Sequence, residues 1–553
     1  MPIVPDFLLR IIASNLAMLQ AWFSHQLYTQ VVKNASRHIL VRMQAKMDLR
    51  EIEQACRGYH HQIGAGAKAT HPVARLVRAL LVKYLNNWSL RQTEEGMRHN
   101  LLVKWFVGYG VFDEVMDHTS LERFEQWVNR EAHRAFFDGV LQHIDEDFPG
   151  EQGAVQIGDT FAMRADAALE GTVDLLRHTC RYLLRDVEQR APGQYAQMDG
   201  QVDRTLLFGP ENEKPVYGMD AMALQARRLQ TLQGVWQLRQ WVEPLCAAWE
   251  AALQMRVRLR LEDLEKIVQD EFQVVVDANG KPVEVKVLAK KDKGEYRQGS
   301  ATDPEATCRN HGGDLTLGYN ASLAVTPHGV IREIQAATGS EPDQAGVAPL
   351  ITAQIEQKGF CPDKMIYDQA AGAGRTRAQV RKVSQGRTQL VARIPPSSVN
   401  GRFAPDDFHF NAEGQLTCPQ GRATRSHFRT QQEADQYEFT AKTCAACPLW
   451  KDCRDPKASL SGPRRVFISD HQNEIRLAQA YNQTPKFKKD MKQRPLVERV
   501  IFMLTQYDGA RRLRSRGRDR ADFQAKMCAT ARNLRTWLTL QLRKEAEGQL
   551  HAA

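Results

Sequence analysis

The sequence has no hydrophobic stretch that is both long enough and free enough of charge to cross a membrane. The most apolar stretch, residues 3–23, is interrupted by Asp6 and Arg10, and no small-residue cleavage site follows it. We therefore expect an amphipathic helix there, with neither a secretory signal nor a membrane partner. Without such a signal, the ten cysteines indicate a reducing cytoplasm, where thiols bind metals or pack in cores rather than form disulfides.

Internal repeats and low-complexity tracts are also lacking, and the composition leaves no room for extensive disorder. Hydrophobic residues make up 42% and charged residues 25% of the 553 residues, which is ordinary for a globular protein. A chain of this length is too long for one compact core, so several packed units are expected.

Positive charge is in excess and is concentrated near the C-terminus. The chain has 75 Lys and Arg residues against 65 Asp and Glu residues, a formal net charge of +10, which favours a polyanionic partner. A solvated helix face would also account for a basic stretch, but alternating arginines gain little from internal ion pairs, so we favour contact with DNA phosphates. The candidate DNA-binding residues are Lys486, Lys488, Lys489, Lys492, Arg494, Arg511, Arg512, Arg514, Arg516 and Arg518.

The first 150 residues show helical periodicity. Residues 73–85 place their apolar side chains on one helical stripe, and Ser89 with Gln92 has the spacing of a capping box. Residues 104–110 are expected to form a turn with buried aromatics, and Asp117 is a candidate cap for the helix that follows. Short helices joined by tight turns fit a helix-turn-helix DNA-binding domain, and they fit a plain helical bundle equally well.

Strand patterns begin after this helical part and are interrupted once. Residues 154–159 alternate as a strand that ends at Asp159, and helical periodicity then dominates to about residue 271. A hairpin, a helix, a strand ending at Asp368, a second helix and a last strand follow, at residues 315–336, 344–358, 364–368, 376–384 and 388–394. This order describes a mixed sheet covered by helices, as in an RNase H-like domain.

The carboxylates at the ends of these strands suit metal-dependent phosphodiester chemistry. Two divalent ions can deprotonate a nucleophile near neutral pH and neutralise the leaving oxygen. Mg²⁺ prefers oxygen ligands, and carboxylates gathered without a cation would repel one another. Strand ends in such a sheet gather where ligands bind, so Asp159 and Asp368, although each alone could be an ordinary cap or turn residue, are candidate Mg²⁺ or Mn²⁺ ligands.

The chain resembles bacterial insertion-sequence transposases of the DDE class, which have an RNase H-like catalytic domain. The resemblance rests on motifs spread over residues 70–540: the runs at 80–108 and 117–124 are similar to their helical DNA-binding domain. The blocks at Asp159-Thr160, 318–325 and 364–368 are similar to their catalytic sheet, and Asp343 resembles the start of the helix that follows the third strand of that sheet. Where relatives often have Ala-Gly-Tyr-Gly after the second Asp, this chain has Gln-Ala-Ala-Gly-Ala-Gly.

The third carboxylate that the resemblance implies is Glu498. In these families the Glu lies in a pattern of Tyr, two residues, Arg, three residues, Glu, six residues and Lys. Arg494 and Glu498 keep the central spacing, whereas Met491 and Thr505 stand at the Tyr and Lys positions. DNA contacts made by that Tyr and Lys in relatives are therefore not carried over to this chain.

A nucleotide-binding loop is an alternative interpretation of the Gly-rich turn after Asp368. Gly372 and Gly374 lie between a strand and a helix, but the third Gly of a dinucleotide fingerprint and the Gly-Lys-Ser/Thr ending of a P-loop are both absent. We therefore favour the catalytic interpretation of this turn.

Four cysteines form a candidate structural zinc site. Cys444 and Cys447 make a Cys-x-x-Cys knuckle, and Cys418 and Cys453 could complete four thiolate ligands. The spacing between Cys447 and Cys453 is wider than in common zinc ribbons, so reduced thiols or a partial site remain alternatives. Such a closed site would serve as a scaffold and not in catalysis, and similar transposases carry a comparable cysteine-containing insertion.

The sequence thus predicts a multidomain α/β DNA transposase. Its expected activity is metal-dependent strand cleavage at transposon ends and strand transfer into target DNA, by a homodimer or larger assembly on double-stranded DNA in the nucleoid-associated cytoplasm. A related nuclease without strand transfer, or an inactive DNA-binding descendant, are the alternatives. The expected domains are a helical DNA-binding domain at 1–150, the first strand of the catalytic domain at 151–165, a mainly helical insertion at 166–304, the continued core at 305–395, a Cys-rich insertion at 396–484 and C-terminal helices at 485–553.

Overall fold

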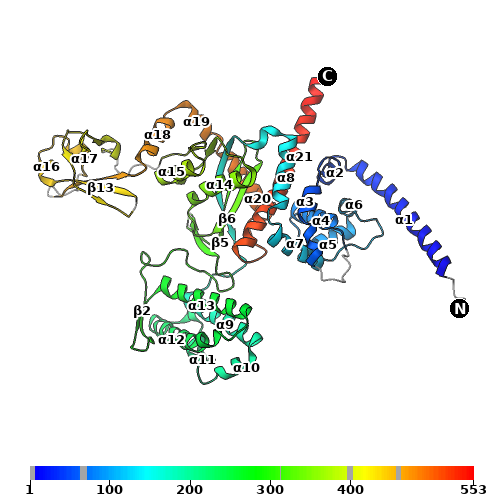
Figure 1. The fold of residues 1–553 in the computed structure, drawn as a ribbon, viewed down its shortest axis with the longest axis horizontal. Helices are drawn as coiled ribbons and strands as arrows, with labels where there is room; N and C mark the ends of the chain where they lie inside the picture. Colours follow the sequence, from blue (N-terminus) through cyan, green and yellow to red (C-terminus); the bar gives the residue numbers. More distant parts are fainter. Residues whose placement is uncertain are drawn as a thin grey trace.

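The computed structural model describes residues 6–62, 71–311, 313–394, 403–431, 433–455 and 462–552. It is a mixed α/β structure in which helices cover a mixed sheet, as expected (Figure 1). No helix within these described residues is long and apolar enough to cross a membrane.

The N-terminal part is helical, as its periodicity predicts. The capping box is confirmed, because Ser89 Oγ accepts from the Gln92 N–H and the Gln92 side chain accepts from the Ser89 N–H. Asp117 caps the next helix but one, as expected. The helices are α1 (Asp6–Asn34), α2 (Ile39–Lys46), α3 (Arg50–Ala55), α4 (Val73–Leu85), α5 (Leu90–His99), α6 (Leu101–Val107), α7 (His118–Glu131) and α8 (Ala135–Asp147).

The predicted turn at residues 104–110 is wrong. Most of it belongs to α6, which is capped by the Asn100 side chain and ends at Gly108, whose φ is 93°. Only Gly108 needs the left-handed backbone that favours glycine. The aromatic residues alone could not distinguish the two structures, because a short buried helix and a buried turn contain similar residue types.

The main sheet has the strand order β4-β5-β1-β7-β8. Strand β6 also pairs with β5, along residues 319–325, whereas β4 pairs with residues 314–318. The strands β4, β5 and β6 form antiparallel pairs, whereas β7 and β8 run parallel to β1. The strands are β1 (Val155–Arg164), β4 (Thr307–His311), β5 (Asp314–Val325), β6 (Ile331–Thr338), β7 (Lys364–Ile366) and β8 (Gln389–Val391); the helices between the later strands are α14 (Val347–Lys358) and α15 (Gly374–Val383).

The C-terminal helices complete the core that the N-terminal helices begin. Side chains of α2–α8, of the sheet, of α20 (Pro495–Gln506) and of α21 (Arg518–Ala552) form one continuous hydrophobic cluster. Trp537 of α21 is fully buried and donates to Asp147 of α8 over 2.7 Å. Asn533 bonds to both backbone groups of Ile331 on β6. Helix α21 therefore ties the N-terminal helices to the sheet (Figure 1).

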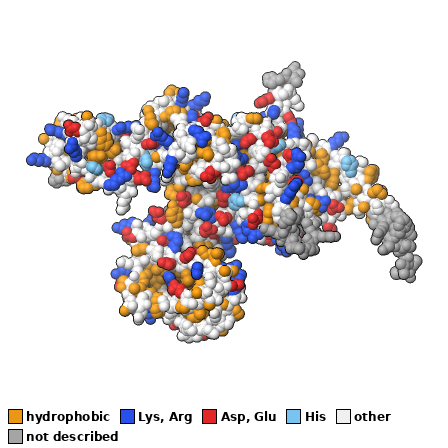
Figure 2. All heavy atoms as spheres, viewed as in Figure 1, with side chains coloured by type: hydrophobic (Ala, Val, Ile, Leu, Met, Phe, Trp, Pro, Cys, Tyr) orange, Lys and Arg blue, Asp and Glu red, His pale blue; other side chains and the backbone are white. Residues whose placement is uncertain are grey.

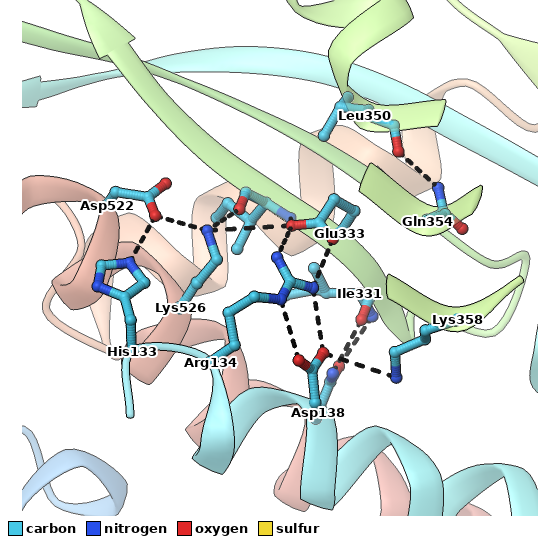
Figure 3. A network of polar contacts seen from close by, with 12 residues as sticks. His133, Arg134, Asp138, Ile331, Glu333, Leu350, Gln354, Lys358, Asp522 and Lys526 are labelled. Carbon is cyan, nitrogen blue, oxygen red and sulfur yellow. Dashed lines mark hydrogen bonds and ion pairs between the residues drawn. The ribbon is translucent and has the colours of Figure 1, made fainter. Parts of the chain in front are cut away.

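A buried polar network makes the same connection beside these apolar contacts (Figure 3). Arg134, before α8, forms a two-pronged ion pair with Glu333 of β6, at 2.8 and 3.1 Å. Asp522 of α21 accepts from His133 at 2.7 Å, from Lys526 at 2.6 Å and from the Ala336 backbone N–H at 2.8 Å. Because buried charges are stable only when paired, this network fixes how the helices meet the sheet.

The helical block between β1 and β4 has its own core. It contains α9 (Thr172–Arg190), α10 (Pro192–Tyr195), α11 (Arg204–Phe208), α12 (Ala221–Cys246) and α13 (Ala251–Glu271), and Figure 1 shows it beside the sheet domain. The hairpin of β2 (Phe272–Val276) and β3 (Pro282–Val287) follows α13 and had no counterpart among the predicted elements.

The cysteine-containing segment forms short strands around a small core of its own. Its strands are β9 (His409–Phe410), β10 (Leu416–Thr417), β11 (Ala423–Thr424), β12 (His427–Arg429), β13 (Ala434–Phe439) and β14 (Arg464–Ser469). Its helices are α16 (Ala441–Ala445) and α17 (Trp450–Cys453), and α18 (Gln472–Asn482) and α19 (Pro485–Met491) lead back to the sheet domain.

Candidate active site

Asp159 and Asp368 lie at the same level of the sheet. The last parallel pair between β1 and β7 joins Ile157 to Ile366, and each Asp comes two residues after its member of that pair. The sequence predicted that the first strand ends at Asp159. This prediction is wrong, because β1 continues to Arg164. Its antiparallel partner β5 covers this extension.

Asp368 caps a short helix. Its side chain accepts from the Ala370 N–H over 3.0 Å and caps the short 3₁₀-helix Gln369–Gly372. The capping bond uses one carboxylate oxygen, and no ion pair to Asp368 occurs among the described residues. A carboxylate has two oxygens with several acceptor positions, so capping leaves it free to bind a cation.

Glu498 is linked to Asp159, but not to Asp368, through Arg494. It lies in the first turn of α20, whose opposite side buries Val497, Val500 and Leu504. The Arg494 guanidinium donates to Asp159 Oδ2 and to Glu498 Oε1, each over 3.0 Å. Residues that are far apart in sequence are thus joined around one guanidinium.

All three predicted carboxylates line one cavity, with a volume of about 440 Å³. Its walls come from β1, β4, β5, α20 and the loops after β6, β7 and α20. Nine of the residues that line the cavity are charged. Its charged lining residues are Asp159, Asp314, Asp343, Asp368, Glu498, Arg164, Arg309, Arg494 and Arg511.

Burial and neighbouring charges act in opposite directions on Asp159. Burial raises the pKa of its carboxyl group most, and the nearby Asp368 and Asp343 raise it further. The Thr160 backbone N–H and the Arg494 guanidinium lower it. The opposing effects show that the acidic groups interact and that a positive charge at this point stabilises the ionised form.

Asp343 is a cavity carboxylate that the sequence analysis named only as the start of a helix. It accepts from Arg309 and from Asn320 Nδ2, each at 3.0 Å, and its backbone carbonyl accepts from the Tyr367 hydroxyl over 3.2 Å. Because Arg309 already balances its charge, Asp343 has a local partner that Asp368 lacks among the described residues. The position of Asp343 directly after the predicted hairpin was the one sequence feature that could have indicated that it lies near the site.

The donor set of the cavity suits a hard divalent cation. Carboxylate oxygens are what Mg²⁺ and Mn²⁺ prefer. Among the described residues, however, no group of three or more His, Cys, Asp or Glu side chains is gathered closely enough to hold one metal ion. The Arg494 guanidinium lies between Asp159 and Glu498 and contacts both.

The predicted DNA-binding residues fall into two groups. The lysines of α19 and Lys492 are exposed, and Figure 2 shows basic side chains gathered over α19. Among the arginines between α20 and α21, Arg514 donates to the Trp88 carbonyl and Arg516 to the Asp166 carbonyl. Arg511 lines the cavity. Some of these arginines therefore hold the chain together, and others face solvent or the site.

The four predicted zinc ligands are brought into one region. Cys418, Cys444 and Cys453 pack against the small core of the module. Burial raises the pKa of Cys444, and the neighbouring thiols Cys453, Cys447 and Cys418 raise it as well. They are close enough to interact, but within the described part of the chain they do not form a metal-binding group.

Two family models match the chain. A transposase domain, DUF772, matches residues 29–127, and a transposase DDE domain matches residues 417–538. The second match includes Glu498 and Arg494, whereas Asp159 and Asp368 lie outside it. Comparisons with curated proteins and with solved structures gave no match. The two family matches lie in separate parts of the chain and agree, and they support its assignment to the insertion-sequence transposases of the DDE class.

Proposed function

We propose that this transposase cuts DNA at transposon ends and joins the freed strand to target DNA, with Asp159, Asp368 and Glu498 as its catalytic carboxylates. The observation that carries the proposal is their convergence: three acidic residues from β1, from the loop after β7 and from α20 line one cavity. The order and direction of the strands support the expected RNase H-like identity of the sheet.

Each carboxylate has a role that follows from its position. Asp159 and Asp368, at the same level of adjacent parallel strands, would hold Mg²⁺ or Mn²⁺, and Glu498 would complete the site from the helix. When bound, the divalent ions supply a deprotonated nucleophile and neutralise the leaving oxygen. The rigid strands fix the spacing of the two aspartates, which is what aligned phosphoryl transfer requires.

The exposed basic side chains of α19 and the arginines beside the cavity would contact the DNA backbone. Phosphate contacts position a duplex without reading its sequence, so recognition of terminal repeats would belong to the N-terminal helices. An element has two ends to be joined, which favours a dimer or larger assembly on DNA.

The test uses the purified chain, Mg²⁺ and DNA that carries both ends of the element encoding it. Joined products support the transposase. Cut products without joining would support a nuclease of related fold, and a mobility shift alone would support an inactive DNA-binding descendant. Products that persist unchanged in Asp368→Asn would overturn the carboxylate assignment.

For the cysteine module, we propose a structural Zn²⁺ held by Cys418, Cys444, Cys447 and Cys453. The mutual effects on the Cys444 pKa support their proximity, and thiolates are preferred Zn²⁺ ligands. Purified protein should contain about one zinc per chain and lose thermal stability on strong chelation. Metal content near zero, with unchanged melting after chelation, would refute the proposal.

A further inference from the structure

Arg494 lies between two of the carboxylates that line the cavity. Its two terminal nitrogens contact Asp159 and Glu498 at 3.0 Å each. Its Nε is buried and has no hydrogen-bond partner among the described residues. A guanidinium that satisfies two catalytic carboxylates but leaves its own buried donor unpaired has not reached its best bonding arrangement.

The charges of the cavity explain why a cation is needed there. The Asp159 carboxyl group, 15% exposed, lines the same cavity as Asp368 and Asp343. Arg309 pairs with Asp343, so the positive charge nearest to Asp159 and Glu498 is Arg494. Carboxylates at such close range stay ionised together only when a cation lies among them.

The contact with Arg494 and a metal ion would use the same oxygens. A metal ligand oxygen must direct a lone pair at the ion at about 2.0–2.1 Å for Mg²⁺. While Asp159 Oδ2 and Glu498 Oε1 accept from Arg494, those atoms are engaged and the two side chains are held about a guanidinium's width apart.

The Glu498 side of the link is open to solvent. The Glu498 side chain is 57% exposed and that of Arg494 is 24% exposed. The Arg494–Glu498 ion pair is therefore weak, because water and salt screen it, whereas the Asp159 side chain at the other end of the link is only 15% exposed. A divalent ion with twice the charge can therefore displace the guanidinium without unfolding α20.

We propose that Arg494 is a positioning residue that holds Asp159 and Glu498 in the metal-free protein and leaves them when a divalent ion binds. The inference rests on the proposed function, because it takes the carboxylates as metal ligands. The displaced guanidinium, with its three donor nitrogens, is then free to bind a DNA phosphate at the mouth of the cavity. Metal entry and DNA contact are thereby coupled through one side chain.

The coupling is tested by Mn²⁺ binding to the full chain without DNA, followed by electron paramagnetic resonance at pH 8. Arg494→Gln should bind Mn²⁺ more tightly by about threefold or more, as expected when one partly exposed competing cation is removed. Arg511→Gln is the matched control, since Arg511 lines the same cavity and forms no ion pair among the described residues. A smaller gain in the control supports displacement. An equal gain in both variants, or none in Arg494→Gln, overturns it.

Two further variants separate this inference from the proposed function. Asp368→Asn should weaken Mn²⁺ binding whatever Arg494 does, because it removes a ligand without touching the guanidinium. If Asp368→Asn binds as the unaltered chain does, the metal site itself is wrong. If only the Arg494→Gln result fails, the site stands and the displacement alone is refuted. Circular dichroism of each variant confirms that it is folded.

Discussion

Tyr367 packs directly against Gly158 across the parallel strands that carry Asp368 and Asp159. A Cβ atom at position 158 would lie 2.5 Å from Tyr367 Cε2 and 2.6 Å from its Cδ2. The Tyr367 side chain is fully buried, so it has nowhere to move. Gly158 immediately precedes Asp159, and Tyr367 immediately precedes Asp368, so we call their contact the spacer between these two proposed catalytic carboxylates.

Gly158→Ala should therefore disturb the site without altering any charged residue. We expect it to lower the free energy of unfolding by roughly 1–3 kcal/mol through overpacking and cleavage by at least about tenfold through misplacement of the aspartates. Urea unfolding and a cleavage assay measure the two effects. Gly193→Ala, where the added Cβ has nothing within 4 Å, is the control. Adding Tyr367→Leu to Gly158→Ala should restore part of the lost stability, because the smaller side chain leaves room for the Cβ atom. Full cleavage activity in the Gly158→Ala single variant would contradict the role of the spacer.

Asp368→Asn should reduce strand cleavage at least about a hundredfold while DNA binding persists, because a metal ligand is lost and the basic surfaces are not. Asp363→Asn is the matched control: Asp363 is exposed just before the same strand, outside the cavity. Cleavage and mobility shift are measured on the same DNA. Near-normal cleavage by Asp368→Asn, or an equal loss in Asp363→Asn, would remove Asp368 from the catalytic set.

The local predictions from sequence succeeded where short-range chemistry decides the structure. The apolar stripe of residues 73–85 and the Ser89 capping box are each set by neighbours within a turn. The strand before Asp368 was also predicted from its own residues, although it ends at Ile366 and not at Asp368. These features need no knowledge of the rest of the chain.

Features that depend on distant segments could not be predicted. The continuation of β1 past Asp159 depends on β5, whose paired residues lie more than 150 positions later. The pairing of Asp343 with Arg309, and the guanidinium between Asp159 and Glu498, exist only once the hairpin and α20 fold against the sheet. The sequence named the three carboxylates but not what holds them.

The exposed lysines of α19 should contribute to DNA affinity through counterion release. Lys488→Gln combined with Lys489→Gln should weaken binding on all sequences and reduce the slope of log affinity against log salt by about 1 per lysine. Fluorescence anisotropy at several salt concentrations gives the slope. Lys266→Gln serves as the control, since Lys266 pairs with Asp270 at 2.7 Å in the helical block. An unchanged slope in the double variant would place the DNA elsewhere.

Ser89→Ala should destabilise the N-terminal helices by about 1 kcal/mol, because it leaves the Gln92 N–H without its cap. Gln92→Ala breaks the same box from the other side. The double variant should lose less than the sum of the two single losses, since both remove one motif. Urea midpoints of the three variants provide the comparison, and strict additivity would argue against a shared box.

Asp522 should make the free energy of unfolding depend on pH in the acidic range. Burial opposes its ionisation, but hydrogen bonds from His133, Lys526 and the Ala336 N–H outweigh burial and lower its pKa to about 2. A lowered pKa stabilises the fold above the unfolded value near 4, and that stabilisation is lost as the pH falls toward 2.

Asp522→Asn should thus be less stable than the unaltered chain at pH 6, by on the order of 2 kcal/mol. The difference should shrink as the pH falls from about 4 toward 2. Urea midpoints of both proteins across this range measure it, and comparing them cancels the titration of other acids. A difference that stays constant with pH would show that Asp522 contributes through packing and not through its charge.

The burial of α21 in the core has a consequence for how the protein is made. Helices α2–α8 leave the ribosome first, yet the side chains that cover them, such as Trp537, come from the last helix. At about 5–20 residues per second, the early helices wait for tens of seconds before their apolar faces are closed. The nascent chain therefore cannot close this core until nearly the whole message is read, and we expect chains that end early to expose these apolar faces to proteases.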